Sequence, residues 1–150
     1  NSYTEENAFG GNNSMNSFNH YALGAVLEWM MAYQLGITPD QESAGYQHFI
    51  LQPSVGGTFT DVTGSYESPY GTIQSAWSAE DGVLTAYDVT VPANTTAVLY
   101  LPVKGKAVLT EGVTGGETEV HNAIDTTRFE LQSGSFHFDV LDGTITVSAR

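Results

Sequence analysis

The most continuous apolar stretch of the chain covers residues 18–35, where only Glu28 is charged. Asn16 or Ser17 can cap its N-terminus, and Gly36 follows as the type of residue that often ends a helix. A helix on a protein surface shows a polar stripe, whereas this one is apolar on nearly every side. The pattern therefore predicts a long helix that is buried by other helices or at an interface.

After residue 45 the pattern changes to short alternating runs rich in Val, Thr, Tyr and Phe, separated by turn residues. Asp81-Gly82 and Asp142-Gly143 predict two tight hairpins. The predicted strands are residues 46–52, 58–66, 71–79, 83–91, 95–101, 107–110, 118–121, 127–131, 135–140 and 144–147. About ten short strands with regular turns indicate an antiparallel sandwich. The expected fold class is mainly β: an antiparallel β-sandwich preceded by one long buried-type helix.

The predicted helix and sandwich do not make a self-sufficient pair. One side of a sandwich cannot enclose a helix that is apolar all round, and each Leu or Phe left in water forgoes about 1.5–3 kcal/mol of burial energy. We therefore expect residues 1–40 to be the C-terminal end of a larger helical domain and residues 41–150 to form the sandwich domain. On this interpretation the chain is a C-terminal fragment, and in isolation it self-associates through residues 18–35.

The charge of the chain excludes several classes of partner. Its 150 residues include four Lys+Arg and 17 Asp+Glu, so the formal net charge is −13, and no base precedes Lys104. Nucleic-acid binding needs clustered bases, and an anionic membrane surface would repel this chain. No apolar run approaches the length of about 20 residues that a membrane span requires. The absence of Cys excludes disulfides and Cys-based zinc sites, but it leaves cytoplasm, periplasm and secretion open.

Four separated segments carry a family resemblance. They are residues 15–30 (MNSFNHYALGAVLEWM), 44–50 (AGYQHFI), 64–71 (GSYESPYG) and 91–97 (VPANTTA). The first resembles the last inner helix of bacterial α-L-rhamnosidases, the second resembles the crossover into the C-terminal sandwich of that family, and the other two are further family-like segments. The resemblance implies a parent enzyme in which an (α/α) toroid holds the active site and a non-catalytic sandwich follows it.

The resemblance also implies the reaction. Enzymes of this family remove terminal α-L-rhamnose from glycosides with inversion, which uses two carboxyl groups separated by about 6.5–9.5 Å. The base Glu of the family lies in a Trp-Glu-x-Trp motif just before a segment like residues 1–4, and the acid lies further upstream. We therefore expect no catalytic residue in this chain, no cofactor and no activity of the chain alone. The implied partners are a rhamnose-containing glycoside, in the parent enzyme, and the upstream helical domain.

Two residues of the first segment are candidates for substrate binding. By the resemblance, His20 points into the sugar pocket and hydrogen-bonds a rhamnose hydroxyl, with Asn19 beside it. The alternatives are a His whose polar atoms are satisfied by backbone and an Asn that belongs to a helix cap. We expect Glu28 to be paired, or to snorkel where helix and sandwich meet, rather than to act as the base.

A second hypothesis is a stand-alone sandwich that binds carbohydrate or has a structural role. Trp77 with Tyr66, Tyr70 and Tyr87 could form a sugar-stacking platform, although packing in the core and turns is favoured. The alternation of Trp77 with its neighbours on the strand predicts a core-facing or interfacial ring.

His137 and Asp139 alternate on one strand face, which is the geometry of half a metal site. No third ligand is apparent in the sequence, and zinc sites need three or four protein ligands. A structural role is therefore favoured for this pair, and no metal is expected.

Overall fold

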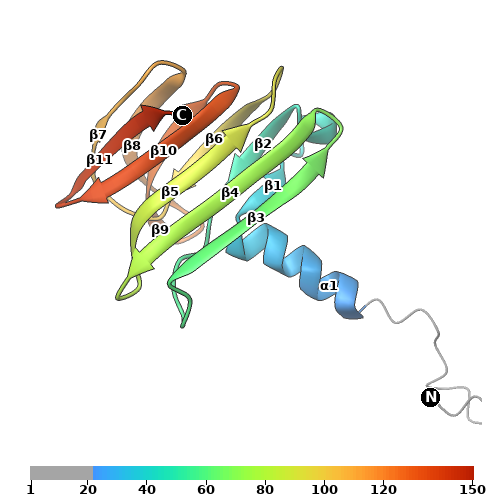
Figure 1. The fold of residues 1–150 in the computed structure, drawn as a ribbon, viewed down its shortest axis with the longest axis horizontal. Helices are drawn as coiled ribbons and strands as arrows, with labels where there is room; N and C mark the ends of the chain where they lie inside the picture. The colour runs from blue at the N-terminus through green and yellow to red at the C-terminus, as the bar shows by residue number, and fades with distance from the viewer. Residues whose placement is uncertain (1–21) are drawn as a thin grey trace, which may run out of the picture.

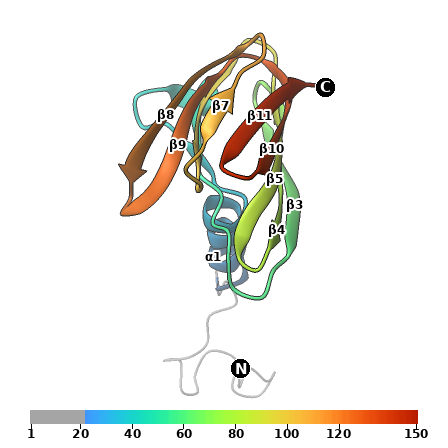
Figure 2. The same cartoon turned by 90° about the vertical axis from the view of Figure 1, so that its left-hand side faces the viewer.

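The computed structural model describes residues 22–150, which form a helical segment and two β-sheets packed face to face (Figure 1). The helical segment consists of α1 (Ala22–Trp29) and its π-helical continuation η2 (Met30–Gln34). Figure 2 shows the two sheets as separate layers, with α1 at one end of the sandwich. The part of the predicted helix before Ala22 lies outside the described residues.

The strands of the described residues are divided between the two sheets. The five-stranded sheet has the order β1 (Ile37–Pro39), β2 (His48–Leu51), β6 (Thr96–Leu101), β9 (Ile124–Leu131) and β8 (Val113–His121). The six-stranded sheet has the order β3 (Asp61–Ser68), β4 (Gly71–Glu80), β5 (Val83–Val91), β10 (Gly134–Leu141), β11 (Thr144–Ala149) and β7 (Lys106–Val108). A 3-10 turn, η3 (Ala44–Tyr46), lies between β1 and β2.

The expected β-sandwich is confirmed, and β5 begins and ends where the sequence pattern predicts. Strand β1 was not predicted, because it is only three residues long and ends in a proline. Two pairs, β2 with β6 and β7 with β11, are parallel, whereas the other pairs are antiparallel. After β2 the chain crosses to the other sheet and forms β3, β4 and β5 there, and it then returns as β6. This long crossover connection allows β6 to pair with β2 in parallel.

Alternation along the strands places the core between the sheets. In β4, Ile73, Ser75 and Trp77 are buried, and the residues between them turn outward. Across the sandwich, the rings of Phe129 on β9 and Phe138 on β10 meet edge to face with centroids 5.1 Å apart. This edge-to-face contact joins the two sheets through their most buried side chains.

The two predicted hairpins are confirmed. Asp81 and Gly82 have φ values of 49° and 76°, and Asp142 and Gly143 have values of 47° and 73°. Positive φ at both central residues is the geometry of a type I′ turn, which matches the twist of the flanking strands. A third turn of this kind, at Asn122-Ala123 between β8 and β9, was not predicted.

The aromatic platform is contradicted for two of its four rings. Trp77 is 2% exposed and Tyr87 is fully buried, so both belong to the core, as the favoured interpretation predicted. The ring of Tyr66 lies 4.6 Å from that of Tyr46, which packs against the core. Only Tyr70, at 40% exposure, presents a substantial surface to solvent.

Candidate functional site

The candidate site is the junction between the helical segment and the sandwich, where hydrogen bonds from the sandwich hold the end of the helix. The last carbonyl groups of a helix have no partner within the helix. Here the side chains of β4 supply partners, because the Trp77 indole Nε1 donates to Gln34 O at 2.8 Å and the Ser75 hydroxyl donates to Leu35 O at 2.7 Å. The buried face of β4 therefore holds the end of the helix.

Backbone groups after β2 complete this anchoring. The amide of Ser54 donates to Tyr33 O at 2.9 Å, and the amide of Gln52 donates to Gly36 O at 2.8 Å. Four successive carbonyl groups, from Tyr33 to Gly36, thus accept hydrogen bonds from the sandwich. Four satisfied carbonyl groups at the junction fix one relative position of the two parts, whereas the side-chain oxygen Oε1 of Gln34 is buried there with no hydrogen-bond partner among residues 22–150.

Two glycines allow this close approach. Gly36 has a φ of 70°, and a Cβ atom there would collide with the backbone of Gln52 and Pro53. A Cβ atom at Gly64 on β3 would collide with the Leu35 side chain, which is itself buried. Gly36 ends the helix as predicted, and its missing side chain also brings the helix end against the chain that follows β2.

The phenol of Tyr87 lies inside the core next to Ser75, one of the residues that bind the helix end. The Tyr87 hydroxyl lies 3.1 Å from the Ser75 hydroxyl, which also donates to the helix end. Burial raises the pKa of the Tyr87 phenol above its usual value, and the hydrogen bond with Ser75 opposes that shift. Tyr87 therefore supports the anchoring hydroxyl in its neutral form.

The opposite side of the helix is apolar and open to solvent. We define the outer helix face as the side chains of Val26, Leu27, Trp29 and Met30, each between 48% and 62% exposed, and Tyr33 borders this face. The rings of Trp29 and Tyr33 stack with centroids 5.9 Å apart and planes inclined by 28°. A contiguous apolar patch of this kind marks an interaction surface rather than a random exposure of single side chains.

Glu28 lies beside this face in a groove between the helix and β3. Leu27 and Met31 line the groove from the helix, and Tyr66 and Glu67 line it from β3. Within residues 22–150, neither Glu28 nor Glu67 is within ion-pair distance of a basic side chain. Glu28 therefore lies where helix and sandwich meet, as predicted, and it forms no ion pair in this part of the chain.

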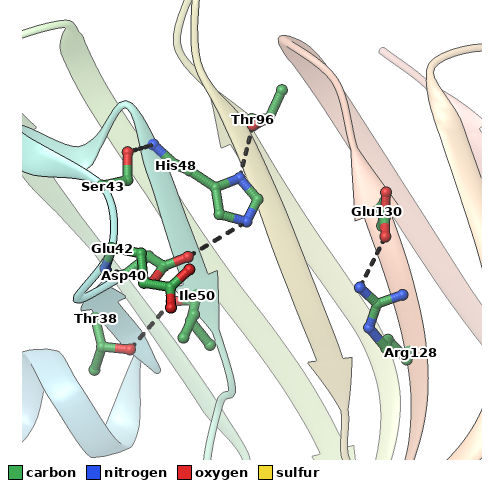
Figure 3. A network of polar contacts seen from close by, with 9 residues as sticks. All are labelled: Thr38, Asp40, Glu42, Ser43, His48, Ile50, Thr96, Arg128 and Glu130. Atoms are coloured by element: carbon green, nitrogen blue, oxygen red, sulfur yellow. Dashed lines mark hydrogen bonds and ion pairs between the residues drawn. The ribbon is translucent and has the colours of Figure 1, made fainter.

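A polar cluster beside β1 was missed by the sequence interpretation (Figure 3). His48 Nδ1 lies 2.7 Å from the Thr96 hydroxyl oxygen, and His48 Nε2 lies 3.8 Å from the Asp40 carboxylate. The His48 amide donates to the Ser43 hydroxyl at 3.1 Å. These contacts tie the loop between β1 and β2 to strand β6. The family-like segment AGYQHFI contains His48, but the residues that contact His48 lie in other segments of the chain. No local sequence pattern therefore predicts these contacts.

His137 takes a structural position, as favoured from the sequence. Its Nδ1 atom lies 2.9 Å from the Asp88 carboxylate, and an Arg150 guanidinium nitrogen lies 2.9 Å from the same carboxylate. Asp139, two residues further along the strand, is exposed. Over residues 22–150, no three His, Asp or Glu side chains gather into a set that could hold a metal.

His20 and Asn19 lie outside the described residues, so their predicted contact with sugar stays a prediction. Among residues 22–150, no helix is long and apolar enough to cross a membrane.

Comparison with known proteins connects this junction to a family of enzymes. The model of the bacterial alpha-L-rhamnosidase C-terminal domain matches residues 36–116. An alpha-L-rhamnosidase from Streptomyces avermitilis is 38% identical over 130 residues, which are 84% of this chain and 12% of that protein. A second, from Formosa agariphila, is 38% identical over 102 residues, or 68% of this chain and 11% of the relative. The chain thus spans about an eighth of the length of these relatives.

Solved structures agree with these matches. The crystal structure of the Streptomyces avermitilis alpha-L-rhamnosidase complexed with L-rhamnose superposes with a TM-score of 0.63 at 34% identity, over 94% of this chain and 13% of that one. The alpha-L-rhamnosidase from Aspergillus terreus gives a TM-score of 0.62 at 24% identity, over 85% of this chain and 12% of that one. The second likeness bears on the fold alone.

Proposed function

Since the chain belongs to the bacterial α-L-rhamnosidase family, through its C-terminal domain, we propose that it is the C-terminal part of an enzyme that hydrolyses terminal α-L-rhamnose from glycosides with inversion. In this proposal the acid and base carboxylates lie upstream of residue 1, so the isolated chain is inactive. Residues 1–40 are the end of the helical catalytic domain, and residues 41–150 are the sandwich domain. The substrate class is a rhamnose-containing glycoside, bound by the parent enzyme.

The role of this chain in the parent enzyme is to hold the last helix of the catalytic domain in place. The supporting observation is the contrast between the two sides of the helical segment. The carbonyl groups at its end accept hydrogen bonds from Ser75 and Trp77. Its outer helix face, in contrast, is exposed to solvent within residues 22–150. A helix whose end is fixed by the sandwich and whose outer face is apolar and exposed is suited to completing a larger helical assembly.

His20 and Asn19 belong to the same proposal. His20 and Asn19 lie two and three residues before Ala22, the first residue of α1. In this proposal, fixing the C-terminal end of the helix also limits where these two residues can lie. With the helix held at its C-terminus by the sandwich, His20 would line the sugar pocket and bind a rhamnose hydroxyl. In the full-length enzyme, His20→Ala is expected to raise KM for an aryl α-L-rhamnoside more than it lowers kcat, because it removes a substrate contact.

A complementation assay tests the proposal. The chain is assayed on an aryl α-L-rhamnoside alone and then together with the separately expressed upstream helical domain of the same protein. We expect no turnover by the chain alone and turnover by the pair. Leu27→Arg, at a residue 62% exposed on the outer helix face, should lower the recovered activity about tenfold or more, because it places a charge in the interface.

Leu141→Arg is the matched control, since Leu141 is 66% exposed but lies at the end of β10, away from the helix. It should leave the recovered activity unchanged. Turnover by the chain alone that is lost in His20→Ala would contradict the proposal, and so would equal complementation by the Leu27→Arg and Leu141→Arg variants.

A further inference from the structure

A second groove lies at the end of the helical segment and adjoins the groove that contains Glu28, since Ala32 and Thr38 line both. We call it the hairpin groove, because one wall is the turn between β8 and β9, with His121 and Asn122. Tyr33 of η2, Thr38 of β1 and the residues after β2 form the other walls. Its volume is about 470 Å³, which falls in the range of about 300–1,000 Å³ that is usual for small-molecule sites.

The hairpin groove is distinguished by its lack of charge. Within the described residues, no Asp, Glu, Lys or Arg lines it, although the chain carries 17 acids. By contrast, the groove between the helix and β3 is lined by Glu28 and Glu67, and a hollow on the six-stranded sheet is lined by Asp88 and Arg150. This lining favours an uncharged ligand, because a charged ligand would find no carboxylate, ammonium or guanidinium group there, and His121 and Tyr33 are the only ionisable side chains among the described lining residues.

The polar groups of the groove are paired in a way that leaves hydrogen-bonding capacity for a ligand. Asn122 Nδ2 donates to Gln52 Oε1 at 2.8 Å across the groove. This bond orients both amides, so that the Gln52 NH₂ group and the Asn122 carbonyl oxygen are left as donor and acceptor. Thr38 and Ser54 line the same groove, and the Thr38 hydroxyl donates to Ile50 O at 3.5 Å. A free amide donor and a free amide acceptor beside these residues suit the hydroxyl groups of a polyol.

Two aromatic rings at the groove are held by stacking. Tyr33 is 56% exposed, and its ring stacks against Trp29. The His121 ring lies parallel to that of Tyr100, with centroids 3.6 Å apart and planes inclined by 8°. Rings held in this way lose little freedom on binding, and an aromatic surface accepts the C–H groups of a sugar ring.

From the neutral lining, the oriented amides and the exposed Tyr33 ring, we propose that the hairpin groove binds an uncharged saccharide. The inference goes beyond the proposed function, because it adds a sugar site on the sandwich that takes no part in hydrolysis. It also differs from the aromatic platform considered above, since none of the four residues of that platform lines this groove.

The test is an NMR titration of the full chain with methyl α-L-rhamnopyranoside and methyl α-D-glucopyranoside as neutral probes and D-galacturonate as a charged probe. We expect at least one neutral probe to give saturable shifts of the Gln52 and Asn122 side-chain amide signals, with much weaker shifts for galacturonate. Tyr33→Ala and Asn122→Gly should each weaken binding about five- to tenfold, through loss of the ring contact or of the amide. Glycine tolerates the φ of 49° at position 122.

Tyr70→Ala removes an exposed ring outside the groove and should leave binding unchanged. The proposal is overturned if neither neutral glycoside shifts these amides, if galacturonate binds equally well, or if Tyr33→Ala and Asn122→Gly bind like the unsubstituted chain. The complementation assay has a different readout, so failure of this site and failure of the proposed function can be told apart.

Discussion

The indole nitrogen of Trp77 donates a hydrogen bond to the backbone oxygen of Gln34, which lies 43 residues earlier in the chain. The same side chain is 2% exposed and packs in the core between the sheets. The ring of Trp77 thus packs in the sandwich core, while its N–H group binds the end of the helix. The stability of the junction is therefore coupled to that of the core.

Trp77→Phe should destabilise the chain by about 2–4 kcal/mol, because it leaves a buried carbonyl without its donor and opens space in the core. Urea unfolding followed by circular dichroism measures this change. Trp29→Phe is the control, since Trp29 is 50% exposed, and its effect should stay within about 0.5 kcal/mol. Equal unfolding midpoints for the two variants would show that Trp77 does not anchor the helix.

Gly36→Ala should cost more than about 3 kcal/mol or prevent folding, because the added Cβ atom meets backbone atoms at a positive φ. Gly143→Ala tests the conformational part alone. Gly143 has nearly the same φ, 73° against 70°, but its added Cβ atom has nothing within 4 Å. It should cost only about 1–2 kcal/mol. Similar losses in denaturant unfolding would mean that the close approach at Gly36 is unimportant.

Stability should fall as the pH rises above about 10. Burial raises the pKa of Tyr46 to about 12, with Tyr66 adding to the shift, and burial also raises the pKa of Tyr87. Above the ordinary pKa of a tyrosine, near 10, the unfolded chain loses these protons first. It therefore binds fewer protons than the folded chain, and stability declines with pH until the folded groups also titrate.

Tyr87→Phe isolates one of these contributions. The variant should be about 1 kcal/mol less stable near pH 9, because Ser75 loses a buried partner. Between about pH 9 and pH 11, however, it should lose less stability than the unsubstituted chain, since it has no phenol to ionise at that position. Urea midpoints at the two pH values give the comparison, with Tyr70→Phe as the exposed control. An identical loss in the Tyr87→Phe variant contradicts the prediction.

The isolated chain should self-associate through the outer helix face. Light scattering over a range of protein concentrations should show an apparent mass that rises above 16.1 kDa. Leu27→Arg should shift the chain toward the monomer, because it interrupts the apolar patch, whereas Leu141→Arg should not. A strict monomer at high concentration would count against this prediction.

The regular strands were predictable because local chemistry determines them. The alternation in residues 83–91 predicted β5 without error, and the two Asp-Gly pairs predicted turns that only residues tolerant of positive φ can form. The Asn122-Ala123 turn has the same geometry but places alanine at a φ of 63°. Asn122 is a residue type typical of such turns, but Ala123 is not, so the pair lacks the Asn-Gly or Asp-Gly pattern and the turn was missed.

The junction was harder to predict, because its contacts join distant parts of the chain. The sequence indicated that the helix ends at Gly36 and that Trp77 faces inward, and both predictions are confirmed. Nothing local shows that Trp77 and Ser75 donate to the helix end, or that His48 meets Thr96 on another strand. Strand β8 begins earlier than predicted, since Gly115 and Gly116 interrupt the alternating pattern at a bulge.

The long separation between the helix end and its donors also sets an order of events in folding. Leu35 and Gln34 precede their side-chain donors by 40 and 43 residues, and His48 on β2 precedes Thr96 on the parallel strand β6 by 48. Contacts of large sequence separation form slowly. On a ribosome, which releases the chain from N- to C-terminus, the carbonyl groups of Gln34 and Leu35 therefore lack their side-chain donors until β4 has emerged and found its neighbours, whereas the amides of Gln52 and Ser54 become available earlier.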